Sequence, residues 1–227
     1  MMRCAKTMQL VSLAGGKLLT AIALLLCICL LLPSVQATGH IVWQKHLGGS
    51  KSDVAYSITH TDRGYAVAGR AGALTADDGD VKDNRGYRDY WIVNPSSSGN
   101  LIWQRRLGGS KDEHAQEVQQ TTDGGYVVAG YSYSNDAHVK GNHGGFDYWV
   151  VKLNQSGLIE WQKCLGGSKW EFAHSIQQTT DGGYIVAGNT DSNDGDVSGH
   201  HGDYDLWVVK LNPLGKLLWQ RCMGGES

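Results

Sequence analysis

Internal repetition restricts the fold of this chain more than any other feature of its sequence. The dipeptide Trp-Gln recurs at positions 43, 103, 161 and 219, at spacings of 60, 58 and 58 residues. When residues 103–160 are aligned with 161–218, 35 of 58 positions are identical. Self-similarity at a period of this length is typical of arrays that stack one supersecondary unit several times. The chain is therefore expected to use one unit repeatedly.

Each repeat carries three short phrases, Leu-Gly-Gly-Ser, Asp-Gly-Gly-Tyr and Asp-x-Trp, with minor variation between copies. Glycine makes up 31 of 227 residues, about twice its usual share of about 7 %, whereas proline occurs only three times. This composition excludes collagen, which needs abundant proline and glycine at every third position. Abundant glycine with little proline favours many tight turns between short strands.

The third repeat predicts four strands, over residues 173–179, 184–188, 205–211 and 216–223. The Asp-Gly-Gly sequence between the first two supplies residues that adopt positive φ in a tight hairpin turn. In the last strand, Leu217, Trp219, Arg221 and Met223 alternate onto one face, as a half-buried strand requires. Nothing after residue 37 has a helical pattern.

Four antiparallel strands in a unit of about 58 residues are the pattern of a β-propeller blade. We therefore expect an all-β fold of tandem four-stranded antiparallel blades, with the recurrent tryptophans packed between adjacent blades. Three full blades, at approximately 48–107, 108–165 and 166–223, would follow one leading strand at Ile41–Leu47. Closed propellers have about 4 to 8 blades, so the ring would be incomplete or open. A three-fold β-prism or β-trefoil is the alternative.

The same strings resemble a known family. The Leu-Gly-Gly-Ser turn, the Asp-Gly-Gly-Tyr hairpin and the Asp-x-Trp-Val-Val-Lys-Leu strand are similar to the bacterial and archaeal β-propeller repeats labelled SBBP. The resemblance covers residues 41–225, approximately the whole chain after its N-terminal segment. It implies an extracellular or cell-surface propeller, and it brings no agreed activity.

Residues 1–37 have the pattern of a signal peptide. Arg3, Lys6 and Lys17 are basic, residues 18–32 form an uncharged apolar run, and residues 35–37 resemble a cleavage site. The run is shorter than the approximately 20 residues of a membrane span, although a retained anchor is the alternative. We expect a secreted or cell-surface protein whose repeat domain occupies residues 38–227.

Removing residues 1–37 removes three basic groups and no acidic ones, which leaves 17 Lys and Arg against 22 Asp and Glu, or −5. An acidic domain without a basic run does not favour nucleic acid as a partner. Two cysteines remain, Cys164 and Cys222, at equivalent positions of two repeats. A disulfide needs Cα atoms within about 7 Å, and equivalent positions of neighbouring repeats are usually farther apart than that. We therefore expect both to be free thiols.

Oxygen-bearing side chains gather in the loop that precedes the third strand of each repeat. In the third repeat, Asp191, Asn193, Asp194 and Asp196 surround a glycine, and Asp205 follows, an arrangement that suggests a Ca²⁺ site. Turn formation is the simpler interpretation of the same residues. No other metal or cofactor is predicted.

No reaction is evident in the sequence, because Gly-Gly-Ser is not a nucleophile elbow and no helix follows it. The repeats are nearly interchangeable, which favours a non-catalytic binding or structural module with an extended surface. The expected partner is an unknown extracellular protein or a glycan, with self-association through open blade edges as a further expectation. Tyr131, Tyr133, Phe146 and Tyr204 are candidates for stacking on sugars. The alternatives are a three-fold lectin and a fragment of a larger surface or propeller protein.

Overall fold

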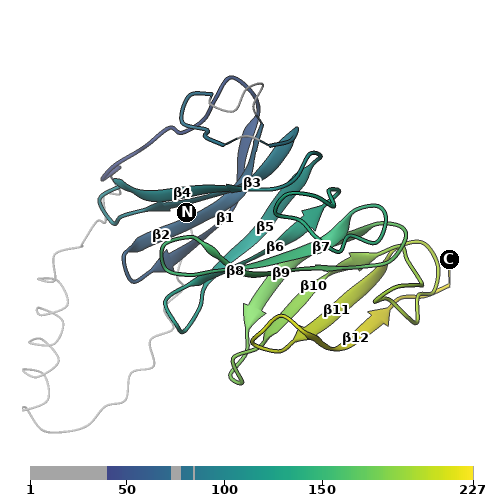
Figure 1. Ribbon diagram of the computed structural model, residues 1–227. Coiled ribbons are helices and arrows are strands. Elements are labelled where there is room, and N and C mark those ends of the chain that lie inside the picture. The colour runs from purple at the N-terminus through teal and green to yellow at the C-terminus, as the bar shows by residue number, and fades with distance from the viewer. Residues whose placement is uncertain (1–39, 73–77, 84, 227) are drawn as a thin grey trace, which may run out of the picture. The chain divides into compact units, whose positions relative to one another are not determined.

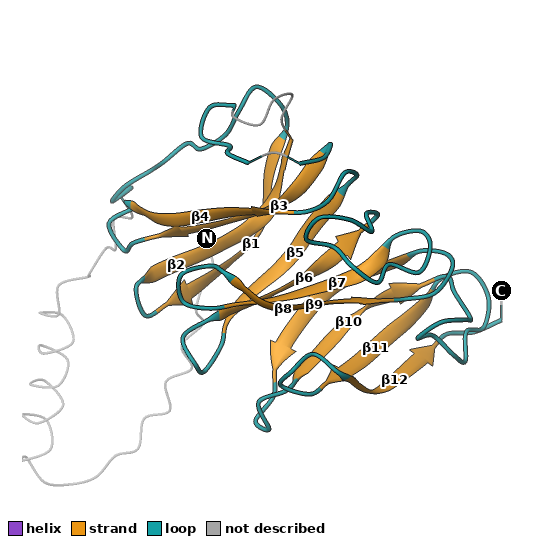
Figure 2. Ribbon diagram, in the orientation of Figure 1, coloured by secondary structure: helices purple, strands orange, loops and turns teal. Residues whose placement is uncertain are grey.

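The computed structural model describes residues 40–72, 78–83 and 85–226. The predicted signal peptide, residues 1–37, therefore lies outside the described residues. Every regular element of the described part is a strand (Figure 2). No helix within these ranges is long and apolar enough to cross a membrane. From Trp43 onward, the described residues form a single compact unit.

Three four-stranded antiparallel sheets make up this unit, and each is a simple meander in chain order (Figure 1). The first sheet contains β1 (Asp53–Thr61), β2 (Gly64–Gly72), β3 (Arg88–Pro95) and β4 (Leu101–Leu107). The second contains β5 (Glu113–Gln120), β6 (Tyr126–Ser132), β7 (Asp147–Leu153) and β8 (Ile159–Leu165). The third contains β9 (Glu171–Gln178), β10 (Tyr184–Thr190), β11 (Asp205–Leu211) and β12 (Leu217–Met223). The prediction of all-β tandem four-stranded blades is confirmed.

The leading strand predicted at Ile41–Leu47 is wrong, because these residues form no strand. In the repeats, the equivalent segment is the fourth strand and pairs with the third strand of its own sheet, as Trp161 of β8 pairs with Lys152 of β7. Among the described residues, each third strand already has such a partner. A segment without a neighbouring strand has nowhere to place its backbone hydrogen bonds in a ladder.

Trp43 nevertheless packs on the first sheet as its counterparts pack on the others. Its ring lies against Gly99, where an added Cβ would come within 2.8 Å of the ring, and its Nε1 donates to the oxygen of Ser97 at 2.9 Å. Trp103 lies against Gly157 and Trp161 against Gly215 in the same way. Each of these glycines has positive φ, between 76° and 80°, so the turn both requires and exposes a residue without a side chain. We call this recurring contact the tryptophan socket.

The hydrophobic core lies between successive sheets. One buried cluster joins Tyr90 and Ile92 of the first sheet to Val128 and Trp149 of the second. A second buried cluster joins the second sheet to the third in the same way. The first and third sheets lie on opposite sides of the second (Figure 1), so the row of sheets is open and does not close into a ring.

The far side of the third sheet shows what an open row leaves uncovered. Trp219 is 46 % exposed, and Leu206 and Met223 are each 49 % exposed. Their counterparts in the second sheet are more deeply buried, with Tyr148 and Leu165 fully buried. The difference arises because the third sheet covers the second, and no described residue follows to cover the third.

Candidate functional site

Aromatic side chains form a continuous surface at one end of the second and third sheets. Tyr133 directly follows β6, Phe146 directly precedes β7, and Trp170 directly precedes β9. Together with three neighbours they form a patch that we call the aromatic ribbon, consisting of Tyr131, Tyr133, Phe146, Trp170, Phe172 and Tyr204. Tyr131 lies near the end of β6 and Phe172 near the start of β9, and the adjoining loops carry the other four rings at the same end of the sheets.

The rings of the ribbon contact one another in sequence across the boundary between the two sheets. Tyr133 and Phe146 have ring centroids 5.0 Å apart, and Phe146 lies 5.6 Å from Phe172. Phe172 in turn contacts Trp170 at 6.3 Å and Tyr204 at 6.2 Å. Distances of 4.5–7 Å with tilted planes are favourable for aromatic pairs. The ribbon is therefore a packed surface whose rings hold one another in place.

Half of the ribbon is open to solvent. Trp170 is 50 % exposed, Tyr204 is 49 % exposed and Tyr133 is 37 % exposed, whereas Tyr131, Phe146 and Phe172 are half-buried beneath them. Exposed rings of this kind offer flat apolar faces together with two phenolic hydroxyl groups. Such side chains are enriched at binding surfaces, because they bury a large area and still form hydrogen bonds.

Polar and charged groups border the ribbon on both sheets. The Lys111 ammonium lies 4.5 Å from the centre of the Tyr133 ring, within the range of a cation–π contact. Lys169 Nζ lies 3.2 Å from Asp191 Oδ1, and both side chains are partly exposed. Hydrogen-bond donors and acceptors therefore stand beside the apolar faces.

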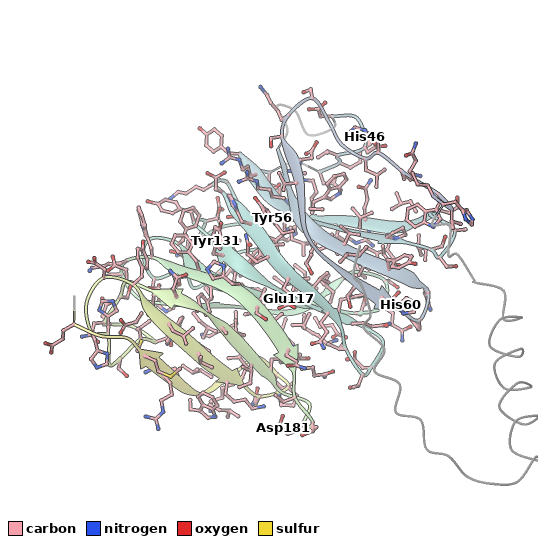
Figure 3. The ribbon with its side chains drawn as sticks, turned by 180° about the vertical axis from the view of Figure 1, so that it is seen from behind. His46, Tyr56, His60, Glu117, Tyr131 and Asp181 are labelled. Atoms are coloured by element: carbon pink, nitrogen blue, oxygen red, sulfur yellow. The ribbon has the colours of Figure 1, made fainter. Side chains whose placement is uncertain are left out.

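The ribbon continues inward to His114, whose ring stacks on Tyr131 with centroids 4.9 Å apart and planes at 21°. Arg70 NH1 lies 3.1 Å from His114 Nδ1. The Arg70 guanidinium lies 5.9 Å from the centre of the ring of Tyr56, which Figure 3 labels. Burial, reinforced by the nearby Arg70 and Arg88, lowers the pKa of His114 to about 4. The imidazole is therefore neutral at physiological pH and serves as a flat stacking partner.

The predicted calcium residues divide between several structural contacts. Asp194 Oδ1 accepts a hydrogen bond from the Ser168 backbone N–H at 2.8 Å, and Asp191 pairs with Lys169. Asn193 Oδ1 accepts from the backbone N–H of His200 at 3.4 Å. The bonds of Asp194 and Asp191 hold the polar loop against the Leu-Gly-Gly-Ser corner and the lysine that follows it, whereas the Asn193 bond lies within the loop.

Asp205 and Asp196 contact other partners, which are histidines. Asp205 is buried, and its Oδ2 accepts the backbone N–H of His201 at 2.8 Å. Asp196 Oδ2 lies 4.0 Å from Nε2 of His143, a residue of the preceding repeat. Among the described residues, no group of three or more His, Cys, Asp or Glu side chains is placed to hold a metal ion. Calcium binding at these residues stays a prediction.

The Gly-Gly corners are sites where carboxylates approach the backbone closely. A Cβ added to Gly166 would lie 2.2 Å from Glu171 Oε2 and 2.9 Å from Asp147 Cγ. A Cβ on Gly167 would lie 2.2 Å from Asp194 Oδ1. The corner therefore needs glycine for the close approach of three acidic side chains, which occupy the space that a side chain would fill.

These corners bury acidic groups between successive sheets. Glu113 is fully buried and accepts the Gly109 N–H at 2.8 Å and the Ser132 hydroxyl at 2.7 Å. Burial raises the pKa of Glu113 to about 7, against the opposing effect of those hydrogen bonds. Burial also raises the pKa of Asp89 and of Asp147, each of which has one buried carboxylate oxygen without a hydrogen-bond partner. Ionisation of these buried carboxyl groups is therefore less favourable in the folded state than in the unfolded chain.

The innermost strands β1, β5 and β9 line a polar trough of about 350 Å³. Glu117 is the one ionisable side chain among its lining residues, and its Oε2 accepts the Ile176 N–H at 2.5 Å (Figure 3). Gln119 Oε1 likewise accepts the Gln178 N–H at 2.7 Å. Side chains of β5 in the second sheet thus accept hydrogen bonds from the backbone of β9 in the third sheet.

The structure brings together all four aromatic residues that the sequence singled out. Reasoning from the sequence missed Trp170, Phe172 and His114, which complete the surface. The signal lay in two positions where all three repeats differ, because Trp170 replaces Ser52 and Asp112, and Phe172 replaces Val54 and His114. No known protein family and no curated protein matches the chain.

Proposed function

We propose that the protein is a secreted or cell-surface β-propeller-repeat module that binds glycans without catalysis, through the aromatic ribbon. The observation that carries the proposal is the surface of three exposed rings, Tyr133, Trp170 and Tyr204, which half-buried rings connect. The apolar face of a pyranose stacks on such rings, and its hydroxyls bond to neighbouring polar groups. Lys169 and Asp191 supply those groups at the border of the ribbon.

Extracellular placement is supported by the sequence of residues 1–37, which has the order of basic, apolar and small residues of a signal peptide. Mass spectrometry of protein recovered from the culture medium of its expression host is expected to show a new N-terminus near residue 38. Retention of residues 1–37 in the membrane fraction would contradict cleavage and favour an anchor.

Glycan binding is tested with an array of neutral and acidic oligosaccharides, followed by calorimetric titration of any hit. Trp170→Ala and Tyr204→Ala are each expected to weaken binding at least tenfold, since each removes a stacking face. Leu218→Ala is the control, because Leu218 is similarly exposed, at 54 %, but lies on β12, outside the ribbon. An array without hits, or equal losses in all three variants, would overturn the proposal.

Self-association is a second candidate role, and we propose that the occupant of the open third sheet is the first sheet of a second copy. In both internal interfaces a fourth-strand tryptophan fills a glycine socket of the next sheet, but Trp219 remains 46 % exposed. The corresponding socket of the first sheet, at Gly99, is filled by Trp43 of the same chain. Docking of a second copy would replace Trp43 by Trp219 of the partner.

Light scattering over a range of protein concentrations distinguishes the outcomes. Trp43→Ala, which empties the Gly99 socket, is expected to strengthen association, and Trp219→Ala is expected to abolish it. A monomer at every concentration in both the parent chain and Trp43→Ala would overturn this role without affecting glycan binding.

A further inference from the structure

A cleft of about 420 Å³ lies between the outer parts of the first and second sheets. Four cationic side chains and one histidine line it, from the loop before β3, from β4 and from the loop before β7. They are Lys82, Arg85, Arg105, Arg106 and His138. These residues are scattered in the sequence. The fold therefore gathers positive charge in an acidic chain that contains no run of basic residues.

Arg106 provides the strongest sign that this cleft takes a ligand. The residue is only 6 % exposed, and its NH2 contacts Asp89 Oδ2 at 3.0 Å and the Ala71 oxygen at 2.8 Å. Its Nε and NH1 are buried and have no hydrogen-bond partner. A buried guanidinium whose donors are unsatisfied is costly, and most such donors in proteins have an acceptor. An oxyanion in the cleft would supply that acceptor.

His138 is prepared to donate a further hydrogen bond. Its Nδ1 lies 3.3 Å from the Gly108 nitrogen and accepts that N–H, so the neutral ring carries its proton on Nε2. Burial, together with the nearby Arg85, lowers the pKa of His138, which keeps the ring neutral. The Nε2–H group is thereby left as a donor toward an acceptor.

Opposing charges reduce the positive potential but leave an excess. Asp83 lines the cleft, and the buried Asp89 pairs with Arg106. Burial raises the pKa of Asp89 against the opposing effect of Arg106, and Asp53 also acts on the Arg106 charge. Three carboxylates therefore face four cationic side chains.

Comparison of the repeats shows that three residues of the cleft are replaced at the next interface. The place of Arg106 is taken by Cys164 and Cys222, and the place of Arg85 by His143 and His201. Asp80 and Asp196 stand where the second repeat has His138. The equivalent position between the second and third sheets keeps positive charge at Lys140, Lys163 and Lys216, but it lacks both the buried guanidinium and the histidine donor of this cleft.

We propose that the cleft between the first and second sheets is an oxyanion site that binds a phosphate, sulfate or carboxylate group. The bidentate donor geometry of guanidinium suits all three groups, and Arg106, Arg85 and His138 supply the specific contacts. The site is separate from the aromatic ribbon, so it stands or falls independently of glycan stacking there.

Calorimetric titration of the full chain with inorganic phosphate, with sulfate, and with glucuronate as a sugar-borne carboxylate tests the site at constant ionic strength. One site per chain is expected. Binding of the inorganic ions alone would identify a free-anion site, whereas tighter binding of glucuronate would identify the acidic group of a glycan. Heat of binding for none of the three would overturn the proposal.

Variants that copy the other repeats are expected to keep the fold and to remove the donors. His138→Asp places the residue that the first and third repeats carry, and Arg85→His does the same at its position. His138→Asp is expected to weaken anion binding at least a hundredfold, and Arg85→His about tenfold. Lys216→Gln, on an exposed turn of the third repeat, also removes one positive charge and is expected to leave affinity within twofold.

Thermal unfolding provides a second measurement, because a ligand that binds only the native state raises the melting temperature. Sulfate also stabilises proteins generally by exclusion from their surfaces, and His138→Asp reports that general effect. The parent chain is expected to gain more stability from sulfate than His138→Asp does. Equal gains in the two proteins would contradict a specific site.

Discussion

The Tyr148 hydroxyl donates to the backbone oxygen of Trp207 at 3.0 Å, which joins the second sheet to the third across their buried interface. The two rings also pack together, with centroids 4.6 Å apart. Tyr90 and Trp149 repeat both contacts one interface earlier, at 2.8 Å and 4.5 Å. The third repeat has Leu206 at the same position, so its outer face lacks the hydroxyl that joins the other sheets.

Tyr148→Phe removes this bond and keeps the ring. The variant is expected to lose about 1 kcal/mol of unfolding free energy in urea, the usual effect of one buried hydrogen bond. Tyr87→Phe, at a side chain that is 77 % exposed, is the control and is expected to change stability by less than about 0.5 kcal/mol. Equal stability of both variants would show that the hydroxyl contributes nothing to the interface.

The tryptophan socket predicts unequal effects of glycine substitution. Gly157 and Gly141 both have positive φ, at 76° and 84°, so alanine is strained at either position. A Cβ on Gly157 would lie 2.9 Å from the Trp103 ring, whereas a Cβ on Gly141 meets nothing within 4 Å. Gly141→Ala is expected to cost about 1 kcal/mol and Gly157→Ala about 1–3 kcal/mol more. Urea unfolding measures the difference, and similar losses would contradict a close socket.

Glu113 predicts a loss of stability as pH rises. Its native pKa of about 7 exceeds the ordinary value of 4.5, so the folded state retains a proton that the unfolded state has already lost. Its contribution is complete below pH 4.5, falls between pH 4.5 and 7, and is constant above that. The span corresponds to about 3 kcal/mol.

Urea unfolding of the parent chain and of Glu113→Gln across this range isolates that contribution. His114 acts in the opposite direction, because its pKa of about 4 makes stability fall as pH decreases from 6.5. The difference between the two proteins removes the His114 effect and is expected to shrink by about 3 kcal/mol from pH 4.5 to 7. Glu226→Gln, at an exposed residue, is the control. Parallel curves for the parent chain and Glu113→Gln would contradict the prediction.

The two free cysteines of the described region predict unequal reactivity. Cys164 is 1 % exposed, and burial raises the pKa of its thiol well above the usual range. Cys222 is partly exposed, and burial raises the pKa of its thiol to about 11. Iodoacetamide labelling with peptide mapping is expected to modify Cys222 faster by at least tenfold, since thiolate and access both favour it. In urea the two rates are expected to converge, whereas equal rates in the native protein would contradict the burial of Cys164.

Leu206→Tyr tests head-to-tail association by adding a contact to the open face of the third sheet, whereas Trp219→Ala removes one. It restores the hydroxyl that joins the other sheets and offers it to the first sheet of a second copy. If copies dock in this manner, light scattering is expected to show tighter association than in the parent chain. Leu218→Tyr, at a 54 % exposed position of β12, controls for a general increase in aromatic surface.

Local sequence patterns predict the sheets well, because each strand is fixed by neighbours a few residues away. The sequence pattern predicts the third strand of the third repeat at 205–211, and the strand occupies Asp205–Leu211. The Asp-Gly-Gly hairpin and the Asn-Pro-Leu-Gly connection carry their own turn geometry, so their positions follow from the residues themselves. The predicted free state of Cys164 and Cys222 is also confirmed.

Features that need partners from distant parts of the chain were harder to predict. The segment at Ile41–Leu47 has the alternation of a strand but no neighbour with which to pair, and alternation alone does not reveal that. The ribbon and the cationic cleft each combine residues from two repeats, so linear charge and composition do not reveal them. Both become visible when aligned repeats are compared for differences and those differences are placed on the sheets.

The tryptophan socket has a consequence for the evolution and engineering of such chains. Trp103 packs against Gly157 as Trp161 packs against Gly215, so both boundaries between sheets use the same contact. An added repeat could therefore pack on its neighbour through that contact, without a different interface. Duplication of a gene segment of one period would lengthen the protein without redesigning its existing interfaces. Selection can then act on the few variable positions of each added unit, such as those of His138 or Trp170, while these contacts stay unchanged.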